Sequence, residues 1–443
     1  MKKITIIGTG YVGLVSGSGL ADFGNDVTCL DVNSQRIKIL SEGKIPFFEP
    51  GLSELVKRNV DANRLHFSTD LDKSLYDSDV IFIAVGTPMD DSGASDISAV
   101  EKVAVDIAKK ITSYKVIAIK STVPIGTCKK IELMIKSKLK KNINIDIVSN
   151  PEFLREGAAV RDFLIPDRVV IGSNSKISLE IMKEVYRPLF LNETPQIITD
   201  LQTAETIKYA SNSFLAVKIS FINEIANLCD KTGADVHVVA RAMGLDGRIS
   251  PKFLHPGPGF GGSCFPKDTE ALINVAEKFN VDLKVVKAAS DTNKLQIKKI
   301  IEKLDKHIKS YKKKKIGILG LAFKANTDDV RESKSIQLIE HLISKKVEIA
   351  AYDPVAIENM RNLFPTVNYK NTMNEVIKNA SAIVIMTDWN EFRALDLEKV
   401  GKIMKEKIII DSRNLLSRDD LFNNEFIFEG VGRPFQKKYD WWS

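Results

Sequence analysis

The chain has 443 residues, which exceeds one ordinary core and predicts two or three domains at about 150 residues each. Its 44% hydrophobic and 27% charged residues are typical of a folded globular protein. The net charge of +7 is modest and lies partly in the lysine run 312–315, so nucleic-acid binding is not expected. No segment approaches the roughly 18 apolar residues of a membrane helix, and we expect a cytoplasmic protein without a signal peptide.

The four cysteines are scattered along the chain. Cys29, Cys128, Cys229 and Cys264 form no CxxC pair, and none has a metal-ligand spacing with the five histidines. The sequence therefore predicts no metal site and a reducing compartment.

The first half of the chain alternates short apolar runs with helical segments. An apolar run at 3–8 leads into a glycine turn, a helix at 11–23 and a second run at 26–31. Further buried strands are predicted at 79–85, 115–120 and 146–149. Strands that alternate with helices indicate a parallel sheet covered on both faces.

The pattern changes in the middle of the chain and then returns. Residues 203–303 predict long helices without strands, interrupted by the glycine- and proline-rich segment 250–266. Strands are predicted again at 315–320, 347–353, 382–386 and 407–411. The fold class is therefore α/β, with two Rossmann-like doubly wound parallel sheets joined by a central helical segment.

The first turn carries the sequence Gly8-Thr9-Gly10-Tyr11-Val12-Gly13 between a strand and a helix. Glycines in this context give the tight turn, the close approach to a pyrophosphate and the helix packing of a dinucleotide site. Asp31 ends the next strand, where a carboxylate binds ribose hydroxyls and repels a 2′-phosphate. The motif thus predicts NAD rather than NADP, with Arg36 nearby as the feature that leaves NADP open.

Three loops follow the predicted strands at the edge where ligands of parallel sheets bind. Segments 85–88 and 121–124 each present a threonine, Thr87 and Thr122, and each ends in a proline. Segment 150–157 presents Glu152 and Glu156, which on a helical turn would share one face. An acidic helix start in solvent is an equally good interpretation of these two carboxylates.

The segment GFGGSCFPKD, at 259–268, contains Cys264, which is the one cysteine outside a predicted strand or helix. Beside an NAD domain, its thiolate would add to a carbonyl, and loss of hydride would then give a thioester. Lys267 would favour the thiolate, and Asp268 or Lys208 would serve as the base. A buried apolar role for the cysteine is the alternative.

The ordered motifs GTGYVG, EPGL, VGTP, STVP, NPEFLREG, GFGGSCFPKD and AFKANTDDVRES resemble the UDP-glucose/GDP-mannose dehydrogenase family nearly end to end. The resemblance implies NAD as cofactor and a two-step, four-electron oxidation of the C6 alcohol of UDP-glucose to a carboxylate. It also implies that Cys264 carries the thioester. A homodimer or larger homo-oligomer follows from the same resemblance.

Residue roles can be carried over from the resemblance. It implies the following catalytic residues: Cys264, Lys208, Asn212, Asp268, Glu152 and Thr122. The implied cofactor-binding residues are Gly8, Gly10, Tyr11, Val12, Gly13, Asp31, Arg36, Thr87, Thr122, Glu156, Lys267 and Arg331. The implied substrate-binding residues are Glu152, Phe153, Leu154, Lys208, Asn212, Arg248, Phe253, Gly261, Lys324 and Arg413, with Arg248 reaching a neighbouring subunit.

The expected domains are an NAD-binding domain at 1–200, a helical dimerisation domain with the cysteine loop at 201–305, and a UDP-sugar domain at 306–443. Sibling enzymes for GDP-mannose or UDP-N-acetylhexosamines share the same motifs. A one-step 3-hydroxyacyl or 6-phosphogluconate type dehydrogenase would need neither Cys264 nor the second α/β domain. A non-catalytic nucleotide-binding module would not need Lys208, Asn212, Cys264 and Asp268 together.

Overall fold

The computed structural model describes residues 1–90, 92–140 and 143–434, and by its internal contacts the chain divides into two units. One unit is Met1–Ser211 with Glu270–Val281, and the other is Asn212–Thr269 with Asp282–Ser443. Two of the three boundaries fall inside helices, after Ser211 and after Thr269, and the third, after Val281, falls between two helices. The expected three-part division remains a prediction.

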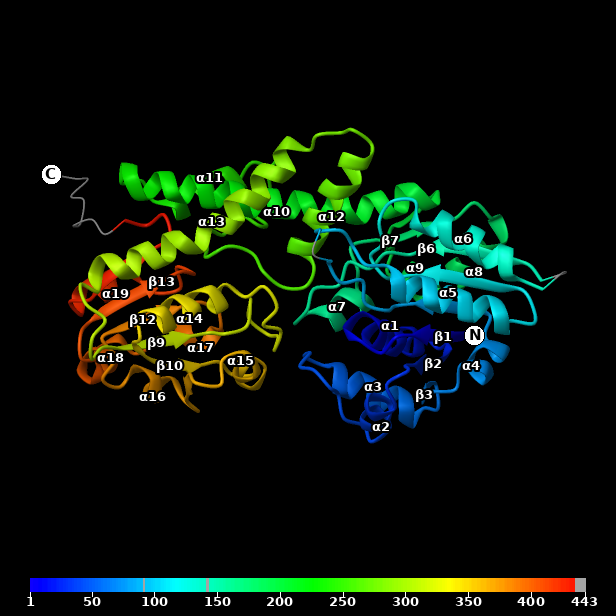
Figure 1. Ribbon diagram of the computed structural model, residues 1–443, viewed down its shortest axis with the longest axis horizontal. Helices are drawn as coiled ribbons and strands as arrows, with labels where there is room; N and C mark the ends of the chain where they lie inside the picture. Colours follow the sequence, from blue (N-terminus) through cyan, green and yellow to red (C-terminus); the bar gives the residue numbers. More distant parts are fainter. Residues whose placement is uncertain (91, 141–142, 435–443) are drawn as a thin grey trace. The chain divides into compact units, whose positions relative to one another are not determined.

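The first unit is built on an eight-stranded sheet, whose first strands are drawn in blue and cyan in Figure 1. Its strands are β1 (Lys3–Ile7), β2 (Asp26–Leu30), β3 (Leu65–Ser68), β4 (Val80–Ile83), β5 (Lys115–Ile119), β6 (Ile145–Ser149), β7 (Val169–Gly172) and β8 (Gln196–Thr199). The order is β3-β2-β1-β4-β5-β6-β7-β8, and all neighbours are parallel except β6 and β7. The first six strands have the doubly wound order whose ligand-binding switch point lies between β1 and β4.

Helices cover both faces of this sheet, because alternate residues of each strand face opposite sides. The helices are α1 (Tyr11–Asp22), α2 (Ser34–Ser41), α3 (Leu52–Asp61), α4 (Leu71–Asp77), α5 (Ser98–Lys110), α6 (Thr127–Lys138), α7 (Ala159–Leu164), α8 (Lys176–Val185) and α9 (Arg187–Phe190). In β4, Val80 and Phe82 pack with α1, α3, α7 and α8, whereas Ile81 and Ile83 pack with α5 and α6. The strands therefore read as continuous apolar runs, as a sheet buried on both faces requires.

Four helices occupy the middle of the chain, and they confirm the predicted helical section. They are α10 (Leu201–Thr232), α11 (Val236–Gly244), α12 (Phe265–Lys278) and α13 (Lys284–His307). No strand lies between residues 200 and 314, all of which the structure describes. The glycine-rich interruption between α11 and α12 is also as predicted.

The second unit contains a six-stranded parallel sheet with the order β11-β10-β9-β12-β13-β14. Its strands are β9 (Lys315–Leu319), β10 (Glu348–Tyr352), β11 (Asn368–Tyr369), β12 (Ala382–Ile385), β13 (Ile408–Asp411) and β14 (Ile427–Gly430). Its helices are α14 (Lys334–Ser344), α15 (Ile357–Leu363), α16 (Met373–Ile377), α17 (Asn390–Arg393), α18 (Leu397–Ile403) and α19 (Arg418–Asn423). This order repeats that of the first six strands of the chain, so the predicted pair of Rossmann-like sheets is confirmed.

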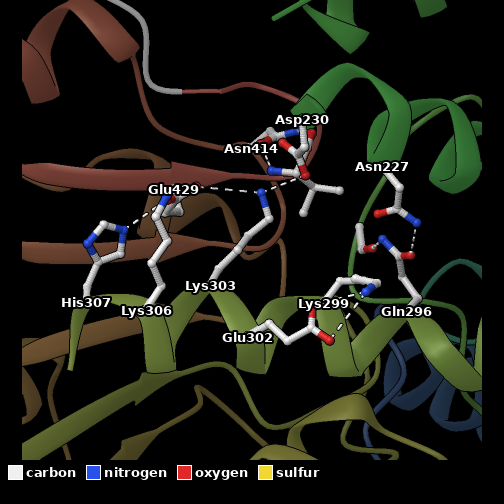
Figure 2. A network of polar contacts seen from close by, with 12 residues as sticks. Asn227, Asp230, Gln296, Lys299, Glu302, Lys303, Lys306, His307, Asn414 and Glu429 are labelled. Atoms are coloured by element: carbon white, nitrogen blue, oxygen red, sulfur yellow. Dashed lines mark hydrogen bonds and ion pairs between the residues drawn. The ribbon is translucent and has the colours of Figure 1, made fainter. Parts of the chain in front are cut away.

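A polar cluster ties α13 and α10 to the last strand of this second sheet (Figure 2). Glu429 of β14 accepts from Lys306 Nζ at 2.6 Å and lies 2.9 Å from His307 Nε2. Lys303 Nζ is 2.7 Å from Asp230 Oδ2 and 3.7 Å from Glu429 Oε2. Apolar residues of the same helices pack on the sheet beside the cluster, so the long helices and this sheet share one core.

Candidate active site

The glycine turn after β1 has the shape that a dinucleotide requires. Gly8 has φ +102°, and a Cβ there would lie 2.6 Å from the carbonyl oxygen of Ala84. A Cβ on Gly13 would lie 1.9 Å from the carbonyl oxygen of Gly8. Gly10 differs, because a Cβ there would meet no atom within 4 Å, and no side chain caps α1 at that residue. The open space and uncapped amides at this helix start fit a pyrophosphate.

Asp31 lies at the end of β2 and is almost buried. Its Oδ2 accepts from the Thr9 amide at 2.9 Å and the Thr9 hydroxyl at 2.8 Å, while Oδ1 accepts from the Asn33 amide at 2.9 Å. Burial raises the pKa of Asp31, but these hydrogen bonds and the charge of Arg36 outweigh it and hold that pKa below its ordinary value. Asp31 is thus a fixed carboxylate, and Arg36 Nη1 faces it at 3.4 Å.

The second sheet has a carboxylate at the corresponding place, but there it is sealed. Asp353 follows β10, is fully buried, and accepts from the amides of Leu321 and Ala322 and from the indole Nε1 of Trp389 at 3.1 Å. Asp353 is 0% exposed, whereas Asp31 keeps 8% exposure, so Asp353 is not accessible to a ribose. The NAD site therefore belongs to the first sheet.

Tyr11 at the start of α1 is tied to two distant loops. Its hydroxyl donates to Glu49 and accepts from the Gly157 amide at 2.9 Å. Glu49, which is 6% exposed, also accepts from the amides of Gly157 and Ala159 at 2.6 and 2.7 Å. Glu49 was not among the residues predicted from the sequence, although it stands in the EPGL motif. Val12, next to Tyr11, is half-buried beside the same core.

The two threonine loops lie at neighbouring strand ends, as predicted. The Thr87 hydroxyl donates to the Thr122 carbonyl at 2.8 Å, so this hydroxyl helps to hold the two loops together. The Ser121 hydroxyl does the same through the Val85 carbonyl at 2.7 Å. Thr122 remains half-buried.

The expected helical turn at Glu152 and Glu156 is wrong. Residues 151–155 have no regular structure, a turn follows at 156–157, and α7 begins only at Ala159. Instead of a shared face, the loop gives the two carboxylates different surroundings: Glu152 is 6% exposed and Glu156 is half-buried. The turn forms where Tyr11 and Glu49 bind the Gly157 amide, a contact that sequence spacing does not show.

Glu152 forms a buried ion pair with Lys208 of α10. Lys208 Nζ lies 3.0 Å from Glu152 Oε1, and the two side chains are 4% and 5% exposed. Phe153 lies beside them, with Lys208 Nζ 5.3 Å and the Arg168 guanidinium 3.6 Å from its ring centroid. Leu154 continues the loop, and its amide donates to Glu152. The predicted acid and lysine are thus brought together within the first unit.

The cysteine loop ends at the start of α12, where Cys264 immediately precedes the helix. The Cys264 carbonyl accepts from the Asp268 amide at 2.8 Å, so Asp268 lies one turn into the helix. Helix starts stabilise negative charge, which favours a thiolate at this position. Cys29, Cys128 and Cys229 are buried, and burial raises the pKa of each thiol.

Asp268 is the centre of a second buried group. Its Oδ2 accepts from Asn212 Nδ2 at 2.6 Å and its Oδ1 pairs with Lys267 Nζ at 2.6 Å. Asp268 is 1% exposed and Asn212 is 7% exposed. The structure therefore joins Asn212, Lys267 and Asp268 one helical turn from the cysteine. It also shows Lys267 bound to this carboxylate, and the cofactor contact expected of Lys267 from the resemblance stays a prediction.

The glycines of the loop are required by close packing against the segment between β9 and α14. A Cβ on Gly261 would lie 2.3 Å from the Glu332 carbonyl oxygen, and one on Gly262 would lie 2.7 Å from the Phe323 ring. Phe253, at φ +64°, packs 6.1 Å from the Phe265 ring. Phe253 and Gly261, which are both predicted to contact the substrate, thus lie on the same ordered loop.

The basic residues predicted to bind substrate and cofactor have different environments. Arg413 donates to the carbonyls of Met386 at 2.8 Å and Phe323 at 2.9 Å, and burial lowers its pKa. Lys324 lies 5.4 Å from the Phe323 ring centroid. By contrast, Arg331 and Arg248 are mostly exposed at 63% and 90% and form ion pairs with Asp329 and Asp246 two residues earlier.

A dinucleotide turn on the first sheet, a second Rossmann-like sheet and a loop cysteine at a helix start are together the features of an NAD-dependent dehydrogenase. Sequence profiles of the UDP-glucose/GDP-mannose dehydrogenase family match in three parts: the NAD binding domain at residues 2–190, the central domain at 202–295 and the UDP binding domain at 317–418. The chain belongs to this family. It is an oxidoreductase, and its cofactor is NAD.

Individual relatives are similar over almost the whole chain. The UDP-glucose 6-dehydrogenase of Rhizobium meliloti (strain 1021) is 46% identical over 439 residues, covering 98% of this chain and 100% of the relative. UDP-glucose 6-dehydrogenase TuaD of Bacillus subtilis (strain 168) is 45% identical, covering 98% and 94%. The solved UDP-glucose dehydrogenase of Pyrobaculum islandicum has a TM-score of 0.90 at 33% identity, covering 98% of both chains.

A relative for another sugar is also similar. The structure of UDP-D-ManNAc dehydrogenase from Pyrococcus horikoshii has a TM-score of 0.85 at 28% identity, covering 97% of this chain and 99% of that one. Among the described residues, no helix is long and apolar enough to cross a membrane.

Proposed function

We propose that this dehydrogenase oxidises the C6 alcohol of UDP-glucose to a carboxylate, giving UDP-glucuronate in two NAD-dependent steps. The support for this substrate is the higher identity to relatives named for UDP-glucose, 46% and 45%, than to the relative named for UDP-D-ManNAc, 28%. GDP-mannose and UDP-N-acetylhexosamines are the alternative substrates.

The observation that carries the mechanism is the buried Asp268 carboxylate, bonded to Asn212 and Lys267 one turn after Cys264. A cysteine used only for packing would not need two polar side chains fixed on a carboxylate in the next helical turn. Cys264 is also only partly buried, unlike the other three cysteines. These features fit a nucleophile with proton-handling groups beside it.

When bound, NAD supplies an acceptor for the hydride that C6 loses in each oxidation. In the first step the alcohol proton leaves through water held by Asp268, and Lys208 and Asn212 orient the C6 oxygen. The Cys264 thiolate then forms a C–S bond with the aldehyde carbon, and Lys208 stabilises the oxyanion. Loss of the second hydride leaves a thioester on Cys264.

Hydrolysis completes the reaction and restores the thiol. Glu152 activates a water held with Thr122, the water adds to the thioester carbon, and the C–S bond breaks to release the carboxylate and the Cys264 thiolate. Glu152 is placed for an ionised role because Lys208 pairs with it at 3.0 Å. Because this mechanism requires Cys264 as a free thiol, we also propose a cytoplasmic location, where thiols stay reduced.

The second unit would hold the nucleotide and the sugar. Arg413 and Lys324 provide positive charge for the diphosphate, and the ordered loop with Phe253 and Gly261 packs against the sugar. Phe153 and Leu154 of the Glu152 loop are proposed as further substrate contacts. Gly8 to Gly13, Asp31, Thr87, Glu156 and Arg331 are proposed for the cofactor.

We also propose that the protein forms a homodimer through α10. Phe214, Phe221 and Leu228 are 64%, 44% and 57% exposed and recur every seven residues along this helix. A stripe with this repeat is typical of a helix that packs against a partner helix. Phe221→Glu should convert the dimer to a monomer in light scattering with size-exclusion chromatography, whereas a wild-type monomer would contradict the proposal.

The thioester can be tested directly by trapping it. With UDP-glucose and excess NAD, Glu152→Gln should accumulate a covalent adduct on the Cys264 peptide that mass spectrometry detects, because hydrolysis slows. Cys264→Ser is the matched control and should show no adduct. Absence of any adduct in Glu152→Gln, with NADH still formed, would contradict the proposed role of Cys264.

A further inference from the structure

A buried lysine at the end of β5 has no role in the chemistry described so far. Lys120 is 4% exposed, and its Nζ lies 3.2 Å from Asn150 Oδ1 and 3.4 Å from the Tyr186 hydroxyl. Within the described part of the chain, no carboxylate lies within 4 Å of this ammonium. A charged group in such surroundings costs free energy, so a purely structural residue here would be apolar.

The partners of Lys120 are themselves fixed. The Tyr186 hydroxyl donates to Asn150 Oδ1 at 2.6 Å, which leaves the tyrosine oxygen able to accept from the ammonium. Asn150 Nδ2 donates to the Val170 carbonyl at 2.8 Å. Asn150 is two residues before Glu152, so the lysine anchors the loop that carries the proposed hydrolytic carboxylate.

Three titratable groups face Lys120, each from a different element. They are Glu152 from the loop after β6, Lys208 from α10 and Tyr186 from the end of α8. Burial lowers the pKa of Lys120 to about 8, the charge of Glu152 opposes this shift, and the charge of Lys208 adds to it. Glu152 forms its ion pair with Lys208, and Lys120 adds a second charge near that pair, so the group carries a net positive charge while both lysines are protonated.

We propose that Lys120 is a positioning residue for the oxidation, which anchors the Asn150–Glu152 loop and supplies the second positive charge behind the Glu152–Lys208 pair. The inference rests on the proposed function of that pair. Without Lys120, the negative charge of Glu152 would neutralise the positive charge of Lys208, and little positive potential would remain to stabilise an oxyanion at C6. With Lys120 present, a net charge of one remains fixed in a dry environment, where it stabilises developing negative charge most effectively.

Activity tests this role through three substitutions. Lys120→Met keeps the length without the charge and should lower kcat ten- to a hundredfold, while the KM for NAD changes less than twofold. The wild type should lose kcat as the pH rises through about 8, where Lys120 loses its proton. That step should vanish in Lys120→Met and move to higher pH in Lys120→Arg, which retains most of the activity.

Tyr186→Phe is the matched structural control, because it removes one partner of Lys120 and keeps the charge. It should lower kcat far less than Lys120→Met and preserve the alkaline step. Equal losses in Lys120→Met and Lys120→Arg, or a pH profile that none of the variants moves, would overturn the proposal. Melting temperatures identify any variant that fails to fold.

A titration independent of turnover separates this inference from the choice of substrate. In protein labelled with 13C at lysine Cε, the Lys120 signal is the one that is absent from Lys120→Met. This signal should titrate near pH 8 in the wild type. In Lys208→Met it should titrate at higher pH, because the like charge of Lys208 is gone. A signal that titrates at about 10.4, the ordinary lysine value, or that Lys208→Met leaves unmoved, would overturn the inference. If the wild type fails to oxidise UDP-glucose, the proposed function fails and this titration still decides the charge coupling.

Discussion

Asp268→Asn is the substitution that most sharply probes the buried group beside Cys264. The change keeps the size of the side chain and removes the charge that Lys267 Nζ and Asn212 Nδ2 both approach at 2.6 Å. A hydrogen bond to a charged group contributes about 1.5–3 kcal/mol. One of the two bonds can be remade with the amide oxygen, and Lys267 at 17% exposure can recover part of its loss from water. We therefore expect a net cost of about 2–3 kcal/mol.

If that cost falls on the transition state, kcat should drop about 30- to 150-fold, since about 1.4 kcal/mol is tenfold in rate. The assay is steady-state NADH formation with UDP-glucose, with kcat and both KM values determined. Asp22→Asn is the matched control, because Asp22 also accepts from one cation, Arg58 at 2.8 Å, and one amide, Asn59 at 3.1 Å. A decrease in kcat of less than threefold for Asp268→Asn, or an equal decrease for Asp22→Asn, would refute the reasoning.

Two further substitutions test the cofactor site and the second unit. Asp31→Ala should raise the KM for NAD ten- to a hundredfold, because a charged hydrogen-bond acceptor for the ribose is lost, and an unchanged KM would place the cofactor elsewhere. Glu429→Gln should lower the unfolding free energy by about 2 kcal/mol at pH 7. This cost is smaller than that of breaking a fully buried ion pair, because Lys303 still forms its ion pair with Asp230 in the variant. Burial raises the pKa of Glu429, but the interactions with Lys306, His307 and Lys303 outweigh burial and hold this pKa below its ordinary value. The stabilisation by Glu429 is therefore fully present above the pKa of the unfolded state and is lost as the pH falls through the pKa of the folded state. The difference between Glu429→Gln and the wild type in urea unfolding should therefore shrink below about pH 4, and a difference independent of pH would contradict this.

Most of the strands that the sequence predicted are rich in apolar residues, although β7, which is apolar and buried on both faces, was not predicted. The runs at 3–8 and 382–386 are buried on both faces, so their composition alone marks them. The edge strand β8 escaped prediction because its Ile197 and Ile198 are about 40% exposed, and a short half-exposed run resembles a loop. Strand β11 has only two residues, too few to give a pattern.

The same limit applies to the candidate site. Cys264 and Asp268 lie one turn apart in the sequence, so local spacing was enough to associate them. Glu49 and Gly157 are 108 residues apart, and no periodicity links them. The expected helical turn at 152–156 failed for this reason, since the long-range hydrogen bonds at Gly157 shape that loop. Lys120 was missed because a lysine at a strand end is ordinarily exposed, and only tertiary packing buries it.

The most direct measurement of the central claim is the yield of NADH from a limiting amount of UDP-glucose with excess NAD, read by absorbance at completion. The proposed course through a Cys264 thioester predicts two NADH for each UDP-glucose consumed. Cys264→Ser should give no such yield while it still binds NAD. One NADH per sugar, or two from Cys264→Ser in steady turnover, would contradict the account.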